Sequence, residues 1–406
     1  MTNRRRILIL SYSNLSTDPR VIRQINSLKN DHDILAYGLS PSNISGISFL
    51  HIRPRNGRTV TFHHEYPVPV RKAFSFIIKN VNRIERRLGK LKRDINSRSN
   101  DFEKRYWSDE RKLLVKKLSA EKFDLIIANE IDTLPLALLI SGGKSRIILD
   151  THEYYPGQYE HDEVWMKYNG RYVHYLCEKY MNKADAVFAV SEGIISEFEK
   201  TFGVKPLLLT NAAPYAELTP SGVDENKIKI IHHGASIRAR KLELMIELMN
   251  YTDDRFTLDL MLIPTDKAYH SELSKLAAGN SKVRLADPVS TETIPHTINS
   301  YDIGLFILPP VNFNYRHALP NKFFEFVQAR LAVAIGPSVE MEKYVRKYDL
   351  GIVARDFSPK SMAEELNKLD AGKISGFKRK SHMHALELSA EKNTELIRSI
   401  ANHLLN

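Results

Sequence analysis

Short runs of aliphatic and β-branched residues recur along the chain, and stretches with helical spacing separate them. Most runs are apolar at consecutive positions rather than alternate ones, which is typical of strands covered on both faces of a parallel sheet. In order they are RILIL, HDILAY, ISFLHI, FDLIIAN, RIILD and AVFAV, then IKIIHHG, FTLDLML, KVRLA, IGLFIL, LAVAIG and GIVA. This alternation predicts an α/β protein with parallel sheets.

The series of strands is interrupted at residues 212–226, AAPYAELTPSGVDEN, which are rich in turn formers and poor in bulky apolar residues. A chain of 406 residues is too long for one ordinary core. We therefore expect a domain at 1–211, a linker at 212–226 and a second domain at 227–384. Residues 385–406 are expected to form a terminal helix.

Composition places the chain among globular proteins, with 43% hydrophobic and 26% charged residues. A single cysteine, Cys177, excludes a disulfide framework and indicates a reducing compartment. The N-terminal apolar run of four residues is too short for a signal peptide. The longest apolar run of this kind, LPLALLI at 134–140, is far too short to span a membrane.

The net charge of +11 is concentrated in one segment. Residues 71–117 hold 16 Lys and Arg against 6 Asp and Glu, a balance of +10. Within it, apolar residues recur at three- and four-residue steps and predict a basic amphipathic helix at 71–98. Such a helix either lies on an anionic membrane surface or packs on its own domain with a solvated basic face.

Several strings resemble functional motifs without meeting their requirements. SGGKS at 141–145 precedes a predicted strand, whereas a phosphate-binding P-loop follows one, and Leu138 stands where its first glycine belongs. No GxGxxG fingerprint occurs, so we expect no nicotinamide or flavin cofactor. The chain has neither HExxH nor a cysteine cluster, so we expect no metal site.

Two stretches of the first domain carry polar residues directly after predicted strands. In SYSNLSTDPRVIRQINSL, Asp18 is placed to cap a helix that begins at Pro19, and Arg20 is expected to face the loop or solvent. In RIILDTHEYYP, a buried strand runs into Asp150, His152 and Glu153. The carboxyl end of a parallel strand is where α/β proteins bind ligands, so either a structural or a ligand-binding role is open for these side chains.

Two stretches of the second domain predict an anion site. In IKIIHHGASIRARKLELMIELM, a strand and Gly234 precede Arg238, Arg240 and Lys241 at the mouth of a helix, where cations oppose the helix dipole unless an anion is bound. An exposed basic loop is the alternative.

In HALPNKFFEFVQARLAVAIGPS, Pro320 is expected at the first helical position, and Asn321 and Lys322 follow it. The free N–H groups at this helix start and the Lys322 charge suit a phosphate. Glu325 lies a turn further in and suits the two hydroxyls of a ribose. This stretch therefore predicts a nucleotide diphosphate site.

The order of DPRVIRQINSL, LDTHE, ADAVFAVSEGIISEF, LLLTNAAP, YDIGLFILP and PNKFFEFVQARLAVAIGP resembles the retaining GT-B glycosyltransferases of family four. The resemblance spans nearly the whole chain. It implies two Rossmann-like domains with parallel sheets facing across a cleft, with the nucleotide sugar held mainly by the second domain. It also implies that the terminal helix crosses back to the first domain.

By this resemblance, Glu325 corresponds to the ribose-binding second glutamate of the family's E-x7-E pattern, and Arg240 to its phosphate-binding basic residue. Lys241 lies beside it, and His152 matches the histidine near the reacting sugar. His317 stands where the first glutamate belongs, which places the donor sugar in question. Gly234 and Arg238 complete the expected donor side, and Asp18, Arg20 and Glu153 the acceptor side.

The expected function is metal-independent, retaining transfer of a sugar from a nucleotide diphosphate sugar, a UDP-sugar in particular, to a glycan or a polyprenyl-diphosphate-linked acceptor. In that context the basic segment 71–98 is interpreted as a contact with an anionic membrane, and the protein as peripheral on the inner face of the cell membrane. Three alternatives stay open. They are a sugar-nucleotide epimerase, a non-catalytic subunit of a transferase, and a nucleic-acid-binding protein, the last supported by charge alone.

Overall fold

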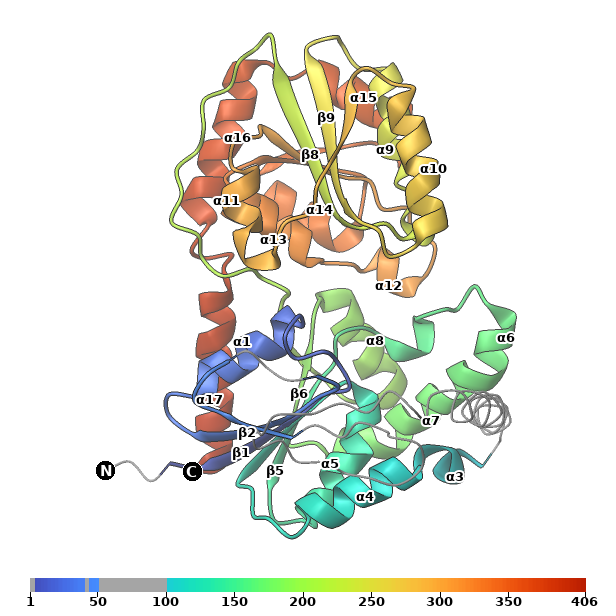
Figure 1. Cartoon of the computed structure of the whole chain (residues 1–406), viewed down its shortest axis with the longest axis vertical. Coiled ribbons are helices and arrows are strands. Elements are labelled where there is room, and N and C mark those ends of the chain that lie inside the picture. Colours follow the sequence, from blue (N-terminus) through green and yellow to red (C-terminus); the bar gives the residue numbers. More distant parts are fainter. Residues whose placement is uncertain (1–3, 41–43, 51–100) are drawn as a thin grey trace, which may run out of the picture. The chain divides into compact units, whose positions relative to one another are not determined.

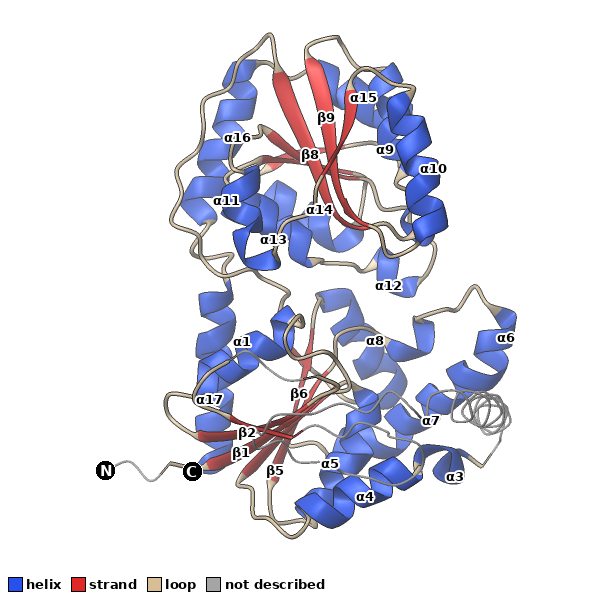
Figure 2. Ribbon diagram, in the orientation of Figure 1, coloured by secondary structure: helices blue, strands red, loops and turns tan. Residues whose placement is uncertain are grey.

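The computed structural model describes residues 4–40, 44–50 and 101–406, and these divide into two compact units. The first comprises Met1–Phe188, Phe198–Leu207 and Ile397–Asn406, and the second comprises Ala189–Glu197 and Leu208–Leu396. The stretch 212–226 thus belongs to the second unit. Each unit has strands at its centre and helices around them (Figure 2).

A seven-stranded sheet forms the centre of the first unit, in the order β3-β2-β1-β4-β5-β6-β7. Neighbouring strands from β3 to β6 pair in parallel. The strands are β1 (Arg6–Leu10), β2 (Asp33–Tyr37), β3 (Ser48–Leu50), β4 (Leu125–Asn129), β5 (Arg146–Asp150), β6 (Ala186–Ala189) and β7 (Leu207–Leu208). All residues of β4, and all but the first of β1 and β5, are buried, as the continuous apolar runs predict.

Helices join these strands and cover the sheet. They are α1 (Pro19–Leu28), α3 (Phe102–Tyr106), α4 (Asp109–Leu118), α5 (Leu134–Ser141), α6 (Glu163–Trp165), α7 (Arg171–Tyr180) and α8 (Glu192–Phe202). Short turns of other helical type are η1 (Ile131–Thr133), η2 (Tyr155–Gly157), η3 (Met166–Gly170) and η4 (Met181–Lys183). Asp18 caps α1 by accepting hydrogen bonds from the backbone N–H groups of Arg20 and Val21, which confirms the predicted helix start.

The second unit contains a six-stranded parallel sheet in the order β10-β9-β8-β11-β12-β13. Its strands are β8 (Ile228–Ala235), β9 (Phe256–Ile263), β10 (Val283–Ala286), β11 (Ile303–Phe306), β12 (Ala332–Ile335) and β13 (Gly351–Val353). Every predicted apolar run in both units contains a strand, and the expectation of parallel sheets is confirmed.

Helices flank both faces of this second sheet (Figure 1). They are α9 (Glu243–Glu247), α10 (Lys267–Ala278), α11 (Ile294–Ile298), α12 (Phe313–Arg316), α13 (Asn321–Gln328), α14 (Val339–Tyr348), α15 (Pro359–Asn367) and α16 (Ala371–His384). The short turns are η5 (Arg238–Arg240), η6 (Leu248–Asn250) and η7 (Thr291–Thr293). One apolar core packs α9, α10 and α15 on the sheet, and another packs α11, α13 and α14.

The terminal helix α17 (Ala390–Leu405) contributes to both units, because the division falls between Leu396 and Ile397. In the second unit, the Ala390 N–H donates to the Ala213 carbonyl. In the first, Arg398 Nε donates to the Ser27 carbonyl over 2.7 Å.

Candidate functional site

The centre of the donor-side group is Gly234, near the carboxyl end of β8. Its φ of +127° is rarely adopted by residues with a side chain. A Cβ at this position would lie 3.2 Å from Lys322 Nζ and 3.8 Å from Arg240 Nη1. Gly234 therefore leaves room where these two basic groups converge.

The three basic residues after β8 point to different surroundings. Arg240 Nη1 lies near Gly234 and 3.5 Å from the Ala235 carbonyl oxygen. Arg238 is exposed, forms two 2.8 Å hydrogen bonds to Glu272, and lies over the Tyr269 ring. Lys241 is exposed in a left-handed conformation with φ +51°. Of the three, only Arg240 is brought to Gly234 in the described structure.

Helix α13 supplies the other side of this group. Pro320 is its N-cap, with φ −82° and ψ 159°, so the expectation of Pro320 at the first helical position was wrong by one residue. Asn321 begins the helix, and within the described residues its Oδ1 is buried without a hydrogen-bond donor. A buried acceptor in this state is a point where a ligand donor fits.

Lys322 extends into the interior rather than along the helix mouth. It is 6% exposed, its Nζ lies 3.2 Å from His232 Nε2 and 4.0 Å from the centroid of the Phe306 ring. Burial and then Arg240 hold the pKa of Lys322 well below its usual value, although Glu325 opposes this. Burial and Lys322 likewise hold the pKa of His232 well below normal. A bound phosphate would reverse the electrostatic part of both effects.

Glu325 is also buried, with Oε2 3.4 Å from His233 Nε2. Burial and then Lys322 lower the pKa of His233 to about 3, so this imidazole is neutral at physiological pH. A neutral ring adds no positive charge beside Glu325, whose carboxylate oxygens can accept hydrogen bonds.

His317, just before the N-cap of α13, contacts Glu340, a residue that the sequence analysis did not assign to the site. Its Nδ1 lies 3.2 Å from Oε1 of Glu340, which is 1% exposed. Burial would raise the pKa of Glu340, but His317, Lys343 and the Gly193 N–H together lower it. A Cβ on Gly193 would lie 1.9 Å from His317 Nδ1, so glycine is required there.

In the first unit, His152 follows β5 and meets acceptors at both ring nitrogens. Its Nδ1 lies 3.0 Å from Glu130 Oε1, and its Nε2 lies 3.2 Å from Asn129 Oδ1. Burial alone would lower the pKa of His152, but Glu130 and then Asp150 outweigh it and raise the pKa. Glu130 adopts φ +71° at the end of β4, a strained conformation for a residue with a side chain.

The expectation that Arg20 faces the loop or solvent was wrong. Arg20 is 5% exposed, and its Nε and Nη2 donate to the two oxygens of buried Asp150 over 2.8 and 2.6 Å. Gln24, one helical turn further along α1, also donates to Asp150. Because a buried carboxylate is stable only when its charge is paired, Arg20 holds the end of β5 against α1.

Glu153 lies beside this cluster. Burial and then the Glu130 charge raise its pKa to about 7, and His152 opposes them. Its Oε1 accepts a hydrogen bond from Gln158 Nε2. A carboxyl group that titrates near neutrality can exchange a proton with a bound hydroxyl.

Sequence reasoning missed five polar residues of these groups, namely Asn129, Glu130, His232, His233 and Glu340. The first four stand at the carboxyl ends of β4 and β8, in the strings IIANE and IIHHG. Polar residues that end otherwise apolar runs were a usable signal. Glu340 carried no such signal, because it lies in the first turn of a helix where acidic residues are common.

The basic segment 71–98 lies outside the described residues. No helix within 4–40, 44–50 and 101–406 is long and apolar enough to cross a membrane. In the same ranges, no group of three or more His, Cys, Asp or Glu side chains is arranged to hold a metal ion.

Residues 95–210 match the model of Glycosyltransferase Family 4. No curated protein sequence matches the chain at a significant level. Among solved structures, Anabaena HepE in complex with UDP-glucose is similar over 98% of this chain and 100% of its own, with 12% identity and a TM-score of 0.69. Sucrose-phosphate synthase from Thermosynechococcus elongatus is similar over 99% of both chains, with 10% identity and a TM-score of 0.71.

TarM, described from S. aureus, matches over 74% of this chain and 59% of its own, with 14% identity and a TM-score of 0.59. At these low sequence identities, the similarities to solved structures establish the fold alone. The chain therefore has the GT-B fold of glycosyltransferases, and its residues 95–210 are similar to Glycosyltransferase Family 4.

Proposed function

We propose that this protein transfers a sugar from a UDP-sugar, with retention of configuration, to a glycan or a polyprenyl-diphosphate-linked acceptor in surface polysaccharide or glycoconjugate synthesis. The observation that carries this proposal is the convergence of Lys322 and Arg240 on Gly234, with Glu325 one helical turn beyond Lys322. Structures of this fold in complex with UDP-glucose and with UDP support the choice of nucleotide.

In this proposal, the diphosphate lies against Gly234 and takes hydrogen bonds from Lys322, Arg240 and the first N–H groups of α13. The two ribose hydroxyls donate to Glu325. As the bond to the sugar breaks, negative charge grows on the departing diphosphate, and the two cations stabilise it in place. These protein cations serve the role of a metal ion, so transfer is expected to persist in EDTA.

His152 is the proposed first-unit residue near the reacting sugar. Glu130 raises the pKa of the imidazole and fixes its orientation. A phosphate oxygen of the donor takes the proton from the acceptor hydroxyl. The hydroxyl then attacks the sugar from the same face that the diphosphate leaves, so the configuration at the anomeric carbon is retained. No pair of carboxylates of the glycosidase kind is then needed.

The membrane contact through 71–98 and the peripheral location at the inner leaflet remain part of the proposal. The charge of this segment supports it, because each basic residue near an anionic surface contributes about 1 kcal/mol. Cosedimentation with phosphatidylglycerol vesicles tests it. Replacing the Lys and Arg of 71–98 by Gln is expected to release the protein.

The engagement of His317 by Glu340 favours one second candidate, a non-catalytic subunit that binds a partner transferase. A turnover assay separates the two. UDP-glucose, UDP-galactose and UDP-N-acetylglucosamine are incubated with polyprenyl-diphosphate-linked acceptors, and the product anomer is read by NMR. Transfer with retention that disappears in Glu325→Ala but persists in Glu247→Ala, an exposed control on α9, supports the proposal. Failure to bind any nucleotide, with no transfer, favours the subunit, and a free epimerised donor favours an epimerase.

A further inference from the structure

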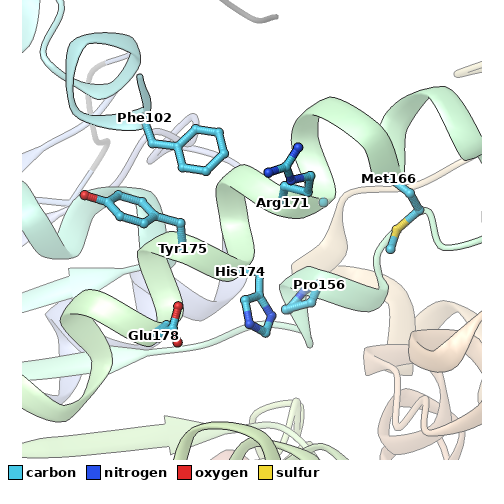
Figure 3. A pocket seen from close by; sticks show the side chains of 8 residues that line it. Phe102, Pro156, Met166, Arg171, His174, Tyr175 and Glu178 are labelled. Atoms are coloured by element: carbon cyan, nitrogen blue, oxygen red, sulfur yellow. The ribbon is translucent and has the colours of Figure 1, made fainter. Parts of the chain in front are cut away.

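A cavity of about 340 Å³ lies in the first unit between α3, η3 and α7 (Figure 3). Its walls combine aromatic and apolar side chains with two opposite charges, and include Phe102, Met166, Arg171, His174, Tyr175 and Glu178. This volume is at the lower end for small-molecule sites and suits one or two sugar rings.

Helix α7 presents two different faces. Tyr172, Leu176 and Cys177 are buried in the core. Arg171, His174, Tyr175 and Glu178 follow the helical spacing of three and four residues and face the cavity instead. Arg171 and Glu178 are exposed and two turns apart, about 10 Å along the helix axis. The cavity is therefore bounded by polar groups at both ends of an aromatic wall.

The aromatic wall is held in place before any ligand arrives. The Phe102 and Tyr175 ring centroids lie 5.2 Å apart, and Tyr175 Oη donates to Glu103 Oε1 over 2.6 Å. Burial would raise the pKa of Glu103, but hydrogen bonds led by Lys179 lower it to about 2. The carboxylate that anchors Tyr175 is thus ionised throughout the physiological range. A rigid wall loses little entropy when a ligand binds.

The opposite wall is the π-helical turn η3, whose end residues Met166 and Gly170 both line the cavity. A Cβ on Gly170 would lie 3.0 Å from Met166 Sδ, so glycine permits the close turn. Turns of this type are less favourable than α-helix and occur frequently at functional sites. The turn gives the cavity its apolar wall.

We propose that this cavity binds a neutral sugar unit of the acceptor glycan, away from the unit that receives the new bond. The proposal rests on the proposed transferase function. Apolar faces of sugar rings pack on aromatic side chains, and the hydroxyls hydrogen-bond to Arg171 and Glu178. Glu178 would repel a phosphate, so a phosphorylated or strongly anionic ligand fits less well.

The test uses the full-length protein on an array of immobilised neutral tri- to hexasaccharides, followed by calorimetry with any that are retained. The double variant Arg171→Ala/Glu178→Ala is compared with a control double variant, Glu163→Ala/Lys167→Ala. The control pair also removes one cation and one anion at exposed positions nearby but outside the cavity. We expect affinity to fall at least about tenfold in the first variant and to change less than about twofold in the control.

UDP-induced thermal stabilisation is measured in parallel and is expected to be equal in wild type and both variants. The proposal is overturned if no neutral oligosaccharide is retained, if both variants bind alike, or if the first variant instead loses binding to phosphatidylglycerol vesicles. If UDP does not stabilise the wild type, that separate result counts against the transferase function itself.

Discussion

Lys322 Nζ lies 3.2 Å from His232 Nε2 in the interior of the second unit, at the start of α13. Nδ1 of His232 lies 2.9 Å from the Leu305 carbonyl oxygen, so the neutral ring offers Nε2 as an acceptor to Lys322. Burial of the Lys322 amine and its repulsion by Arg240 make this arrangement unfavourable for an ordinary core, and Glu325 offsets only part of it. The arrangement is reasonable for a site that acquires the negative charge of a diphosphate.

Lys322→Met is expected to stabilise the nucleotide-free protein. The substitution keeps the apolar length of the side chain and removes a buried amine, so the free energy of unfolding should rise by about 1 kcal/mol or more. Thermal unfolding of wild type and variant without nucleotide measures this. A clear fall in melting temperature would show that Lys322 is a structural residue.

Gly234→Ala is expected to weaken both folding and nucleotide binding. The φ of +127° strains an alanine by about 1–3 kcal/mol, and the new Cβ lies 3.2 Å from Lys322 Nζ. Gly222→Ala is the control, because its Cβ meets nothing within 4 Å. Equal melting temperatures for the two variants would contradict the assigned role of Gly234.

Glu130→Gln is expected to lower the pKa of His152 toward or below its ordinary value, because the opposing charge is lost while burial remains. A group whose pKa is higher in the folded than in the unfolded protein stabilises the fold at pH values below its unfolded pKa. This stabilisation is lost as pH rises through its folded pKa. The variant should therefore lose more stability at pH 5.5 than at pH 9, by about 1 kcal/mol or less for this partly exposed pair.

The same variant should move the alkaline limb of the pH–rate profile to lower pH. His152→Asn is the companion variant, expected to abolish that limb. An unchanged limb in Glu130→Gln would show that Glu130 does not set the protonation of His152.

His317→Glu restores the acidic residue at the first position of the family pattern, yet it is expected to destabilise this protein. The new carboxylate would face Glu340, which is 1% exposed and lies 3.2 Å from His317 in the wild type. Two like charges in contact, one of them buried, should cost about 2 kcal/mol. Adding Glu340→Gln should recover most of the loss, and failure of that rescue in chemical denaturation would remove Glu340 as the cause.

Glu153→Gln is expected to flatten the pH dependence of stability between about pH 4.5 and 7. Burial and Glu130 raise the pKa of Glu153 from 4.5 to about 7, so its stabilising contribution is complete below pH 4.5 and declines as pH rises through 7. Melting temperatures across this range compare wild type, the variant and the exposed control Glu160→Gln. Parallel curves for all three would contradict the shift.

The sequence predicted the strands well because most contain continuous apolar runs, and those of β1, β4, β5, β11 and β12 are buried along all or nearly all of their length. It also identified Asp18 as a cap, since an Asp-Pro pair before an apolar helix leaves little choice. Arg20 was misplaced because helical spacing cannot show that a charged residue at the inward edge has a buried partner 130 positions away.

The sequence did not distinguish Arg240 from its basic neighbours Arg238 and Lys241. That distinction depends on Glu272, which draws Arg238 outward, and on the left-handed turn at Lys241. The His152 environment depends on β4 pairing beside β5, which brings Asn129 and Glu130 to it. The string IIANE marks Asn129 and Glu130 as polar residues that end a strand, but local sequence does not show that they meet His152.

Isothermal titration of UDP into wild type, Lys322→Met and Arg238→Met tests the central claim most directly. Arg238 is the matched control, because it is a cation of the donor loop that is exposed and paired with Glu272. We predict that Arg238→Met binds within about threefold of wild type, whereas Lys322→Met loses at least about tenfold in affinity. Binding of UDP by Lys322→Met as tight as by wild type would contradict the assignment of the Lys322 and Arg240 pair as the phosphate site.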